Sequence, residues 1–335
     1  MVQLGVFVGE NNWTFFKDIY EEMSTCFETR VFKRREFHTP LYSGKLNHLV
    51  FSRDIQELLN HCDVCFFEWA SDLLAAASHM SKRCRIITRL HSFELYEWAP
   101  RINWNNVDKI VVLSQAMRSM FVELYPEQAQ KLVIIHNGCS LDRFNFFPDK
   151  DFTFTLGMLS TITPIKRIYE VVLMLNELVN LGYPATLRIA GNPDNDERYA
   201  VAIQRLVKKL NLQDHVFFDG FIHDTPAWLQ KIDVLISNSY WEGQQTALIE
   251  ALASGCYCLA HFWNGVDEML PPDHIYVTEN ELMKKIISYA QLPELKKTAL
   301  RSQMRTCAQE MFDINSTKEK IFQVIKQEHA QYGSI

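Results

Sequence analysis

The most informative stretch of this chain reads Ser237-Asn-Ser-Tyr-Trp-Glu-Gly-Gln-Gln-Thr-Ala-Leu-Ile-Glu-Ala-Leu-Ala-Ser-Gly-Cys-Tyr-Cys258. Residues 233–236, just before it, begin with a polar side chain and continue as an apolar run, which predicts a short buried strand. Residues 247–253 have helical spacing, and Gly255 stands where a helix C-cap is expected. The stretch therefore predicts a strand, a loop and a helix, the repeating unit of a parallel α/β sheet.

Two acidic residues occupy this predicted unit. Glu242 falls in the loop, and Glu250 lies eight residues later, about two turns along a helix of 3.6 residues per turn. Parallel sheets bind phosphorylated ligands where a strand ends and the next helix begins. The carboxylate in the loop and the one on the helix can therefore contact different parts of one ligand. An isolated pair with this spacing is more often two solvated glutamates, so its interpretation depends on the rest of the chain.

Bulk composition excludes several classes of protein. The chain has 335 residues, of which 47% are hydrophobic and 22% charged, which suits two globular domains. Its net charge of −6 provides no electrostatic footprint for nucleic acid. No apolar run is long enough to span a membrane, and the N-terminal residues read as a first strand and not as a signal peptide. We expect a cytoplasmic protein.

The eight cysteines raise the question of a metal site or a disulfide. Cys62 and Cys65 are the closest pair with metal-like spacing, but both fall in a predicted buried strand and no second pair with zinc spacing follows. Buried free thiols are therefore the favoured interpretation.

Strand-like and helical patterns alternate along the whole chain, which predicts doubly wound parallel sheets. Strands are expected at residues 4–8, 64–67, 86–90, 110–113 and 133–135, and again at 155–159, 186–190, 215–218, 234–236 and 257–260. The expected helices include residues 55–59, 279–290 and 294–311. The polar and aromatic stretch 141–151 between these series reads as a linker. We expect an N-terminal Rossmann-like domain at residues 1–145, a second one at 152–312, and a helix at 313–335.

The combination of Glu242-Gly243, Glu250 and Ala251-Leu-Ala-Ser-Gly255 resembles the signature of the retaining glycosyltransferases of family 4. In that signature a loop written E-G-x-x opens a helix, a second Glu follows, and A-x-x-S/C-G ends the helix. The resemblance implies the GT-B architecture, in which two Rossmann-like doubly wound parallel-sheet domains face each other across a cleft. Some members return their C-terminal helix to the first domain, and residues 313–335 are the candidate here.

The segment Leu156-Gly-Met-Leu-Ser-Thr-Ile-Thr-Pro-Ile-Lys166-Arg167 resembles the family's strand, loop and helix in which a Lys reaches the donor diphosphate. A lysine at a loop–helix junction supplies a movable positive charge beside backbone N–H groups. The family usually places an Arg about five residues before that Lys, whereas this chain has Thr161. We expect Arg167, or an arginine of the N-terminal half, to replace it.

Two further segments of the second half fit the resemblance. Ala190-Gly191-Asn192 resembles the family's turn after a strand, and Ile222 closes a segment whose backbone would read the nucleotide base. Asp194-Asn-Asp196 looks like a D-x-D metal motif, but it lies among turn formers and the family does not generally need one. We expect no metal and no cofactor, only the nucleotide-sugar substrate.

In the first half, Arg89-Leu-His91 follows a predicted strand, where the family commonly has a His that contacts the transferred sugar. Residues 134–144 resemble the family's I-P-N-G-V-D-x-x-x-F signature, with His136 replacing the Pro. The first loop, Gly9-Glu-Asn-Asn-Trp13, departs from the family's Gly-Gly pair and leaves acceptor recognition open.

The resemblance implies transfer of a sugar, with retention, from a UDP- or GDP-linked donor to a glycan, lipid-linked or protein acceptor. Glu242 would bind the donor sugar, Glu250 the ribose hydroxyls, and Lys166 the diphosphate, while His91 would contact the sugar. The expected catalytic residues are Glu242, His91 and Lys166; the expected donor-binding residues are Glu250, Arg167, Gly243, Gln244, Gln245, Thr246, Gly191, Ile222 and Arg89.

Three alternatives stay open. The missing upstream Arg and the altered first loop motivate a non-catalytic nucleotide-sugar-binding protein, and the shared architecture allows a sugar-nucleotide epimerase. Phe32-Lys-Arg-Arg-Glu36 is either a solvated strand edge or a peripheral contact with the anionic inner face of a membrane.

Overall fold

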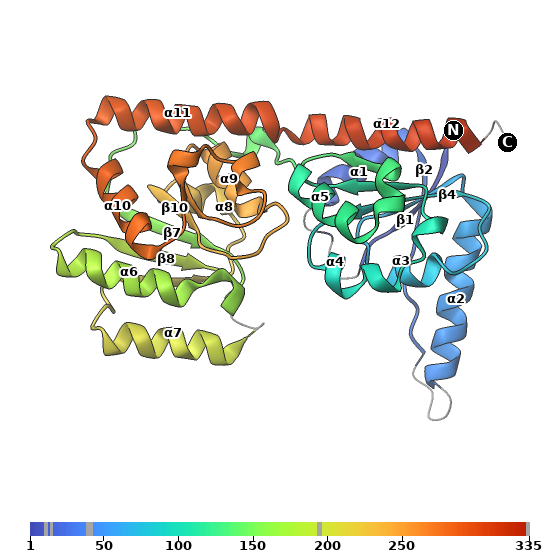
Figure 1. Ribbon diagram of the computed structural model, residues 1–335, viewed down its shortest axis with the longest axis horizontal. Coiled ribbons are helices and arrows are strands. Elements are labelled where there is room, and N and C mark those ends of the chain that lie inside the picture. The colour runs from blue at the N-terminus through green and yellow to red at the C-terminus, as the bar shows by residue number, and fades with distance from the viewer. Residues whose placement is uncertain (10–12, 14–15, 38–42, 193–195, 333–335) are drawn as a thin grey trace. The chain divides into compact units, whose positions relative to one another are not determined.

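The structure is a computed structural model that describes residues 1–9, 13, 16–37, 43–192 and 196–332. The chain divides into two compact units (Figure 1). Unit 1 consists of Met1–His136 and Ile314–Ile335, and unit 2 consists of Asn137–Asp313.

The six-stranded sheet of unit 1 is parallel throughout, in the order β2-β1-β3-β4-β5-β6. Its central strands are continuous apolar runs, as expected where helices cover both faces of a sheet. The strands are β1 Gln3–Phe7, β2 Glu28–Val31, β3 Val64–Phe67, β4 Arg85–Leu90, β5 Lys109–Val112 and β6 Leu132–Ile134. The helices are α1 Lys17–Cys26, α2 Ser43–His61, α3 Asp72–Ala77, α4 Glu94–Glu97, α5 Gln115–Leu124 and α12 Ile314–Tyr332.

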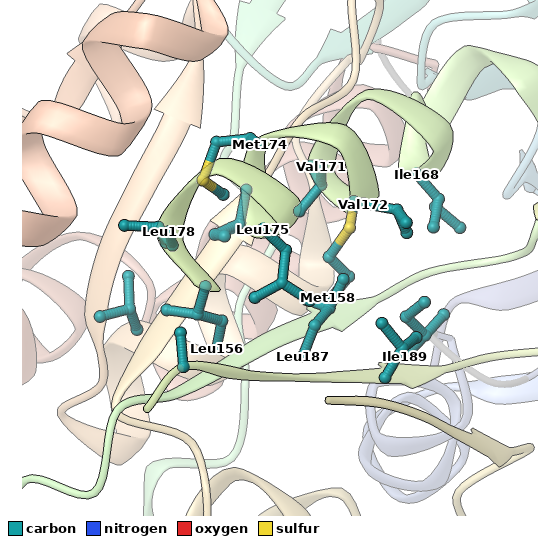
Figure 2. Packing of buried hydrophobic residues seen from close by; sticks show 14 of the residues in the cluster. Leu156, Met158, Ile168, Val171, Val172, Met174, Leu175, Leu178, Leu187 and Ile189 are labelled. Atoms are coloured by element: carbon teal, nitrogen blue, oxygen red, sulfur yellow. The ribbon is translucent and has the colours of Figure 1, made fainter. Parts of the chain in front are cut away.

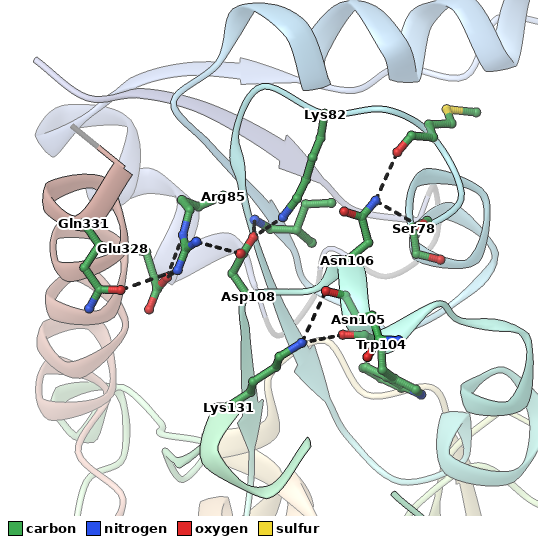
Figure 3. Close-up of polar contacts among 12 residues, drawn as sticks. Ser78, Lys82, Arg85, Trp104, Asn105, Asn106, Asp108, Lys131, Glu328 and Gln331 are labelled. Atoms are coloured by element: carbon green, nitrogen blue, oxygen red, sulfur yellow. Dashed lines mark hydrogen bonds and ion pairs between the residues drawn. The ribbon is translucent and has the colours of Figure 1, made fainter. Parts of the chain in front are cut away.

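Helix α12, the last in the chain, belongs to unit 1 and completes its core. Ile321, Phe322 and Ile325 are buried in one cluster with Leu4 and Val6 of β1. Charged side chains fix the register of the helix: the guanidinium of Arg85 on β4 binds the buried carboxylate of Glu328 at 2.6 Å and that of Asp108 at 2.8 Å (Figure 3). Unit 1 is therefore assembled from both ends of the chain.

Unit 2 repeats the architecture with a second parallel six-stranded sheet, in the order β12-β11-β10-β7-β8-β9. The strands are β7 Thr155–Leu159, β8 Thr186–Ala190, β9 Val216–Gly220, β10 Val234–Ser237, β11 Tyr257–His261 and β12 Ile275–Tyr276. The helices are α6 Ile168–Asn180, α7 Glu197–Lys209, α8 Thr225–Leu229, α9 Thr246–Ser254, α10 Glu279–Ala290 and α11 Glu294–Met311.

Helix α6 shows how the sequence positions the elements of unit 2. Its apolar residues recur at helical spacing, so one face packs onto the inward side chains of β7 and β8 (Figure 2). Val172 and Leu175 of α6 are fully buried against Leu156 and Leu187 of the sheet. This packing sets where α6 begins, and with it the place of the loop that precedes the helix.

The two parallel-sheet units confirm the predicted fold class. Two strands were missed, because β2 is a half-exposed edge strand of alternating polarity and β12 has only two residues. Residues 141–151 do not form a linker: they lie in unit 2, where Arg301 of α11 donates to the carbonyl of Lys150 at 2.8 Å and Arg305 to that of Phe144 at 3.0 Å. Arginines of α11 therefore hold the backbone of this segment against unit 2.

Candidate functional site

The carboxyl ends of β7 and β10 in unit 2 bring two of the predicted catalytic residues together. Lys166 follows β7 and Glu242 follows β10, and the Lys166 ammonium lies 2.5 Å from Glu242 Oε1. Both side chains are mostly buried, with 17% and 13% of their surface exposed. The hydroxyl of Ser239 donates to the same carboxylate oxygen at 2.7 Å. The sequence assigned Lys166 and Glu242 to one ligand without showing their contact, and Ser239 was missed.

Arg167, the expected replacement for the family's upstream arginine, is directed elsewhere. It adopts the left-handed conformation, with φ 51° and ψ 42°, between the short turn Pro164–Lys166 and helix α6. Because of this turn, the side chains of Lys166 and Arg167 diverge, and the Arg167 guanidinium pairs with Glu279 at the start of α10. Glu279 was not among the residues singled out in the sequence.

Residues 243–246 lead into α9 as predicted, with Gln245 as the N-cap and Thr246 as the first helical residue. The Gln245 side chain makes no capping hydrogen bond to α9 in the described structure. Gly243 and Gln244 are buried, and Gln244 Oε1 accepts a hydrogen bond from the backbone N–H of Asn137 at 2.6 Å. Gln244 therefore supports the loop from within unit 2.

Gly191 lies where two strand ends approach closely. A Cβ atom at this position would stand 1.7 Å from the carbonyl oxygen of Ser160, so only glycine fits. Its N–H donates to the carbonyl of Gly220 at the end of β9, 2.8 Å away. Ile222 follows that strand and packs against the core beneath α8 and α9. Both predicted positions thus lie at the carboxyl edge of the sheet.

Glu250 lies on α9, two turns after Glu242 in the sequence, and is largely buried. Burial raises its pKa to about 7, and the positive charge of Arg143 offsets only part of that rise. A carboxyl group with this pKa is poised between its neutral and charged forms at neutral pH. Such a group can accept hydrogen bonds from ligand hydroxyls once a ligand is bound.

Several polar atoms at the same edge have no hydrogen-bond partner among the described residues. They are the hydroxyls of Ser160, just after β7, and Ser237, the last residue of β10, and the amide oxygen of Gln245. Buried polar atoms in native structures are nearly always paired. Unpaired atoms gathered at the carboxyl ends of parallel strands mark a place where a polar ligand can supply the missing bonds.

In unit 1 the predicted residues Arg89 and His91 belong to a buried cluster around Glu68. Arg89 is 1% exposed, and its guanidinium binds Glu68 Oε1 at 2.6 Å. The Nε2 atom of His91 lies 3.1 Å from the Glu68 carbonyl oxygen and 3.4 Å from Oε1, and the ring stacks on Trp69 at 3.9 Å. Arg89 is thus enclosed in unit 1, with its guanidinium on the Glu68 carboxylate.

Register explains why Glu68 lies beside Arg89. Phe67 of β3 pairs with Thr88 of β4, so the next residue of each strand also faces its neighbour. A carboxylate just after β3, beside a guanidinium on the neighbouring strand β4, was a signal available in the sequence once the strand order was known. Glu68 was not among the predicted residues.

The remaining predictions fall on paired or undescribed residues. Asp194 of the D-x-D stretch lies outside the described residues, as do positions 10–12 of the first loop, and Asp196 caps α7 by accepting from the N–H of Tyr199 at 3.0 Å. Within the described part of the chain, no three His, Cys, Asp or Glu side chains are grouped so as to hold a metal ion.

The basic stretch after β2 is largely neutralised by neighbouring acids. Arg34 binds Asp72 at 2.7 Å, and Arg35 pairs with Asp54 of α2. Among the helices that the structure describes, none has the length and apolarity needed to cross a bilayer.

Comparison with known proteins agrees with this geometry. The architecture is the GT-B fold: the Anabaena protein HepE, solved in complex with UDP and glucose, superimposes with a TM-score of 0.78 at 16% identity, over 97% of this chain and 100% of that one. The sequence matches the family described as glycosyl transferases group 1 over residues 142–309, half of the chain, and glycosyltransferase family 4 over residues 12–143. This chain belongs to the group 1 glycosyl transferases.

Two curated relatives come from Staphylococcus aureus. Protein CapJ is 26% identical over 156 residues, which make up 45% of this chain and 39% of CapJ. The poly(ribitol-phosphate) alpha-N-acetylglucosaminyltransferase of strain COL is 24% identical over 156 residues, 45% of this chain and 29% of that enzyme. The match therefore spans well under half of each of these relatives.

Proposed function

We propose that the chain is a retaining glycosyltransferase that moves a sugar from a nucleotide diphosphate to a glycan or lipid-linked acceptor without a metal ion. The observation that carries this proposal is the 2.5 Å contact between Lys166 and Glu242 at the carboxyl edge of the unit 2 sheet, in the loops that include the one leading into α9. A cation and a helix N-terminus together suit a diphosphate, and a neighbouring carboxylate suits sugar hydroxyls.

Departure of a nucleoside diphosphate develops negative charge on its leaving oxygen. The Lys166 ammonium and the first N–H groups of α9 are fixed before the reaction begins, so they stabilise that charge most in the transition state. Glu242 pairs with Lys166 and would exchange this ion pair for hydrogen bonds to the donor sugar. Protein groups alone can thus carry the electrostatic work that a divalent cation performs elsewhere.

His91 is assigned a contact with the transferred sugar. Its Nε2 atom faces two oxygens of Glu68, the carbonyl at 3.1 Å and Oε1 at 3.4 Å, so Nε2 bears the proton. Nδ1 is then left to face a sugar hydroxyl, in a ring plane held by Trp69. Glu250, largely buried on α9, is assigned the ribose hydroxyls.

The names of relatives and fold neighbours guide the substrate proposal. A fold neighbour was solved with UDP and glucose, and one relative is an N-acetylglucosaminyltransferase that acts on poly(ribitol-phosphate). We therefore place UDP-linked hexoses first among candidate donors, with GDP-linked sugars second, and glycan polymers first among acceptors. A cytoplasmic location, with or without peripheral membrane contact, completes the proposal.

A donor-turnover assay tests the assignment. Lys166→Ala and Glu242→Ala should each lower turnover of the nucleotide sugar by about 100-fold or more, as expected when a preorganised electrostatic group is removed. Arg188→Ala is the matched control. Arg188 and Asp219 form an ion pair in the same unit at 2.5 Å, with 30% and 12% of their side chains exposed. Both residues lie on strands, β8 and β9, and not in the loops that carry Lys166 and Glu242. If folded Lys166→Ala and Glu242→Ala proteins turned over donor like the control, this pocket would be wrongly assigned.

The same preparations separate the alternatives. A thermal-shift screen against UDP, GDP, ADP and their sugars identifies the base, since a bound nucleotide raises the apparent stability of the protein. Binding without turnover across a broad acceptor panel would support a non-catalytic nucleotide-sugar binder. An epimerised product formed from the nucleotide sugar alone would support an epimerase.

A further inference from the structure

The loop that carries Lys166 is held in an unfavourable backbone conformation. Arg167 has φ 51°, one of three non-glycine residues with positive φ among those the structure describes. This left-handed conformation is disfavoured for residues with a Cβ atom, so surrounding contacts must hold it. Arg167 directly follows Lys166, so a contact that holds the Arg167 backbone also holds the loop that carries Lys166.

The contact that holds this peptide comes from Asn238, the residue after β10. Asn238 is 1% exposed, and its side-chain Nδ2 donates to the carbonyl oxygen of Arg167 at 2.9 Å. The next residue, Ser239, donates its hydroxyl to Glu242 at 2.7 Å. One short segment at the end of β10 therefore supports both members of the Lys166–Glu242 pair.

Tyr276 fixes which way the Asn238 amide faces. Tyr276 lies on β12, is 1% exposed, and donates its hydroxyl to Asn238 Oδ1 at 2.7 Å. Burial raises the pKa of Tyr276 well above its ordinary value, so the phenol keeps its proton at neutral pH and remains a donor. With Oδ1 bound to a donor, Nδ2 is directed toward the Arg167 carbonyl.

We propose that Tyr276 and Asn238 are positioning residues that hold the Arg167 carbonyl and thereby keep Lys166 facing the diphosphate site. The inference rests on the proposed function for its ligand, but the hydrogen-bond relay itself is a property of unit 2. Both side chains are 1% exposed, and neither residue was predicted from the sequence. The relay spans three strand ends, from β12 through β10 to the loop after β7.

The chain offers a matched control for the phenol. Tyr289 of α10 is also 1% exposed, and its hydroxyl is buried with no hydrogen-bond partner among the described residues. Tyr276→Phe and Tyr289→Phe thus remove the same atom from the same core, but only the first breaks a relay to the loop. Asn238→Asp is the second variant: it keeps the shape of the side chain and replaces the donor with an acceptor.

Hydrogen–deuterium exchange and UDP titration test the relay together. The N–H groups of Lys166 and Arg167 donate to the carbonyls of Thr163 and Pro164, each at 3.0 Å. Tyr276→Phe should raise exchange at these two amides and the Kd for UDP about fivefold, as expected for loss of one buried hydrogen bond. Asn238→Asp should exceed that effect, and Tyr289→Phe should match the parent protein in both measurements.

The outcomes distinguish this inference from the proposed function. Unchanged exchange at Lys166 and Arg167 in both relay variants would overturn the positioning role, whatever the ligand. Raised exchange with unchanged UDP affinity, in a parent protein that binds UDP, would show that the relay does not act on the ligand site. A parent protein that binds none of UDP, GDP or ADP would instead overturn the proposed function, while the exchange data still decide the relay.

Discussion

The two units place an ion pair at the carboxyl edge of the same kind of sheet, but they treat it differently. In unit 1, Glu68 and Arg89 are almost completely buried, with 0% and 2% of their side chains exposed. In unit 2, Lys166 and Glu242 keep 17% and 13% of their surface exposed. The first pair is enclosed by protein on every side, whereas solvent, and hence a ligand, can reach the second.

Backbone geometry follows the same division. Every described residue with positive φ lies in unit 2, three of them not glycine, and they include Arg167 beside the Lys166–Glu242 pair. Unit 2 also holds the largely buried Glu250, whose carboxyl group has only the charge of Arg143 to offset its burial. Strain and incompletely paired charge are typical of sites that wait for a ligand. The comparison separates a fully enclosed pair, Glu68 with Arg89, from a pair that solvent reaches, Lys166 with Glu242.

The largest expected effect on the free energy of unfolding comes from breaking the buried Glu68–Arg89 pair. Glu68→Ala leaves the Arg89 guanidinium enclosed without its carboxylate, so it should lower the free energy of unfolding by about 3–5 kcal/mol. Lys166→Ala, which breaks the partly exposed pair, should change it by about 1 kcal/mol or less. Urea unfolding followed by tryptophan fluorescence measures both. Equal losses in the two variants would contradict this distinction between the two pairs.

The next effect concerns pH. The pKa of Glu250 is raised from 4.5 to about 7, so the folded protein holds this proton more tightly than the unfolded chain does. Burial of this group destabilises the folded state only when the carboxyl group must lose its proton. The destabilisation is absent below pH 4.5, grows between pH 4.5 and about pH 7, and is complete above that. Glu250→Gln removes the charge, so its stability relative to the parent should rise by about 3 kcal/mol between pH 4 and pH 8.

Urea midpoints of the parent and Glu250→Gln at the two pH values provide the measurement. Because both proteins share every other titrating group, the difference between them isolates Glu250. A difference that stays constant with pH would show that Glu250 is charged in the folded protein, already paired like Glu68. That outcome would remove one of the contrasts between the two units.

The smallest expected effect is at the strained residue. Arg167→Gly and Arg167→Ala both lose the ion pair with Glu279, but only glycine adopts the left-handed conformation without a steric penalty. Arg167→Gly should therefore be more stable than Arg167→Ala by about 1 kcal/mol, measured by the same urea titration. If alanine were the more stable of the two, the backbone at this position would not be strained.

The sequence predicted those parts of the fold that depend on local pattern. Strands β3, β7 and β8 and helices α10 and α11 were predicted with the bounds that the structure shows, because each is a long or strongly apolar segment with clear periodicity. Helix α2 was predicted only at residues 55–59, whereas it runs Ser43–His61, since its first turns are exposed and carry little apolar periodicity.

The candidate site was predictable where a motif carried it, at Lys166, Glu242 and Glu250. Two residues beside Lys166 and Glu242 were not: Asn238 and Tyr276 act through contacts between segments far apart in the sequence. The same holds for Glu68, which depends on the pairing of β3 with β4. Ser239, only three residues from Glu242, was also missed. Motif spacing reports which groups meet a ligand, whereas the groups that orient them depend on strand order, which local pattern does not contain.

The return of α12 to unit 1 has a consequence for synthesis on the ribosome. The segment that buries Ile321 and Ile325 against β1 is translated after all of unit 2. Unit 2 can therefore fold as it emerges, while the sheet of unit 1 waits with an uncovered apolar face. If the last helix were removed, unit 1 would keep this apolar face uncovered. We expect unit 1, although it is translated first, to depend more on chaperones than unit 2 does.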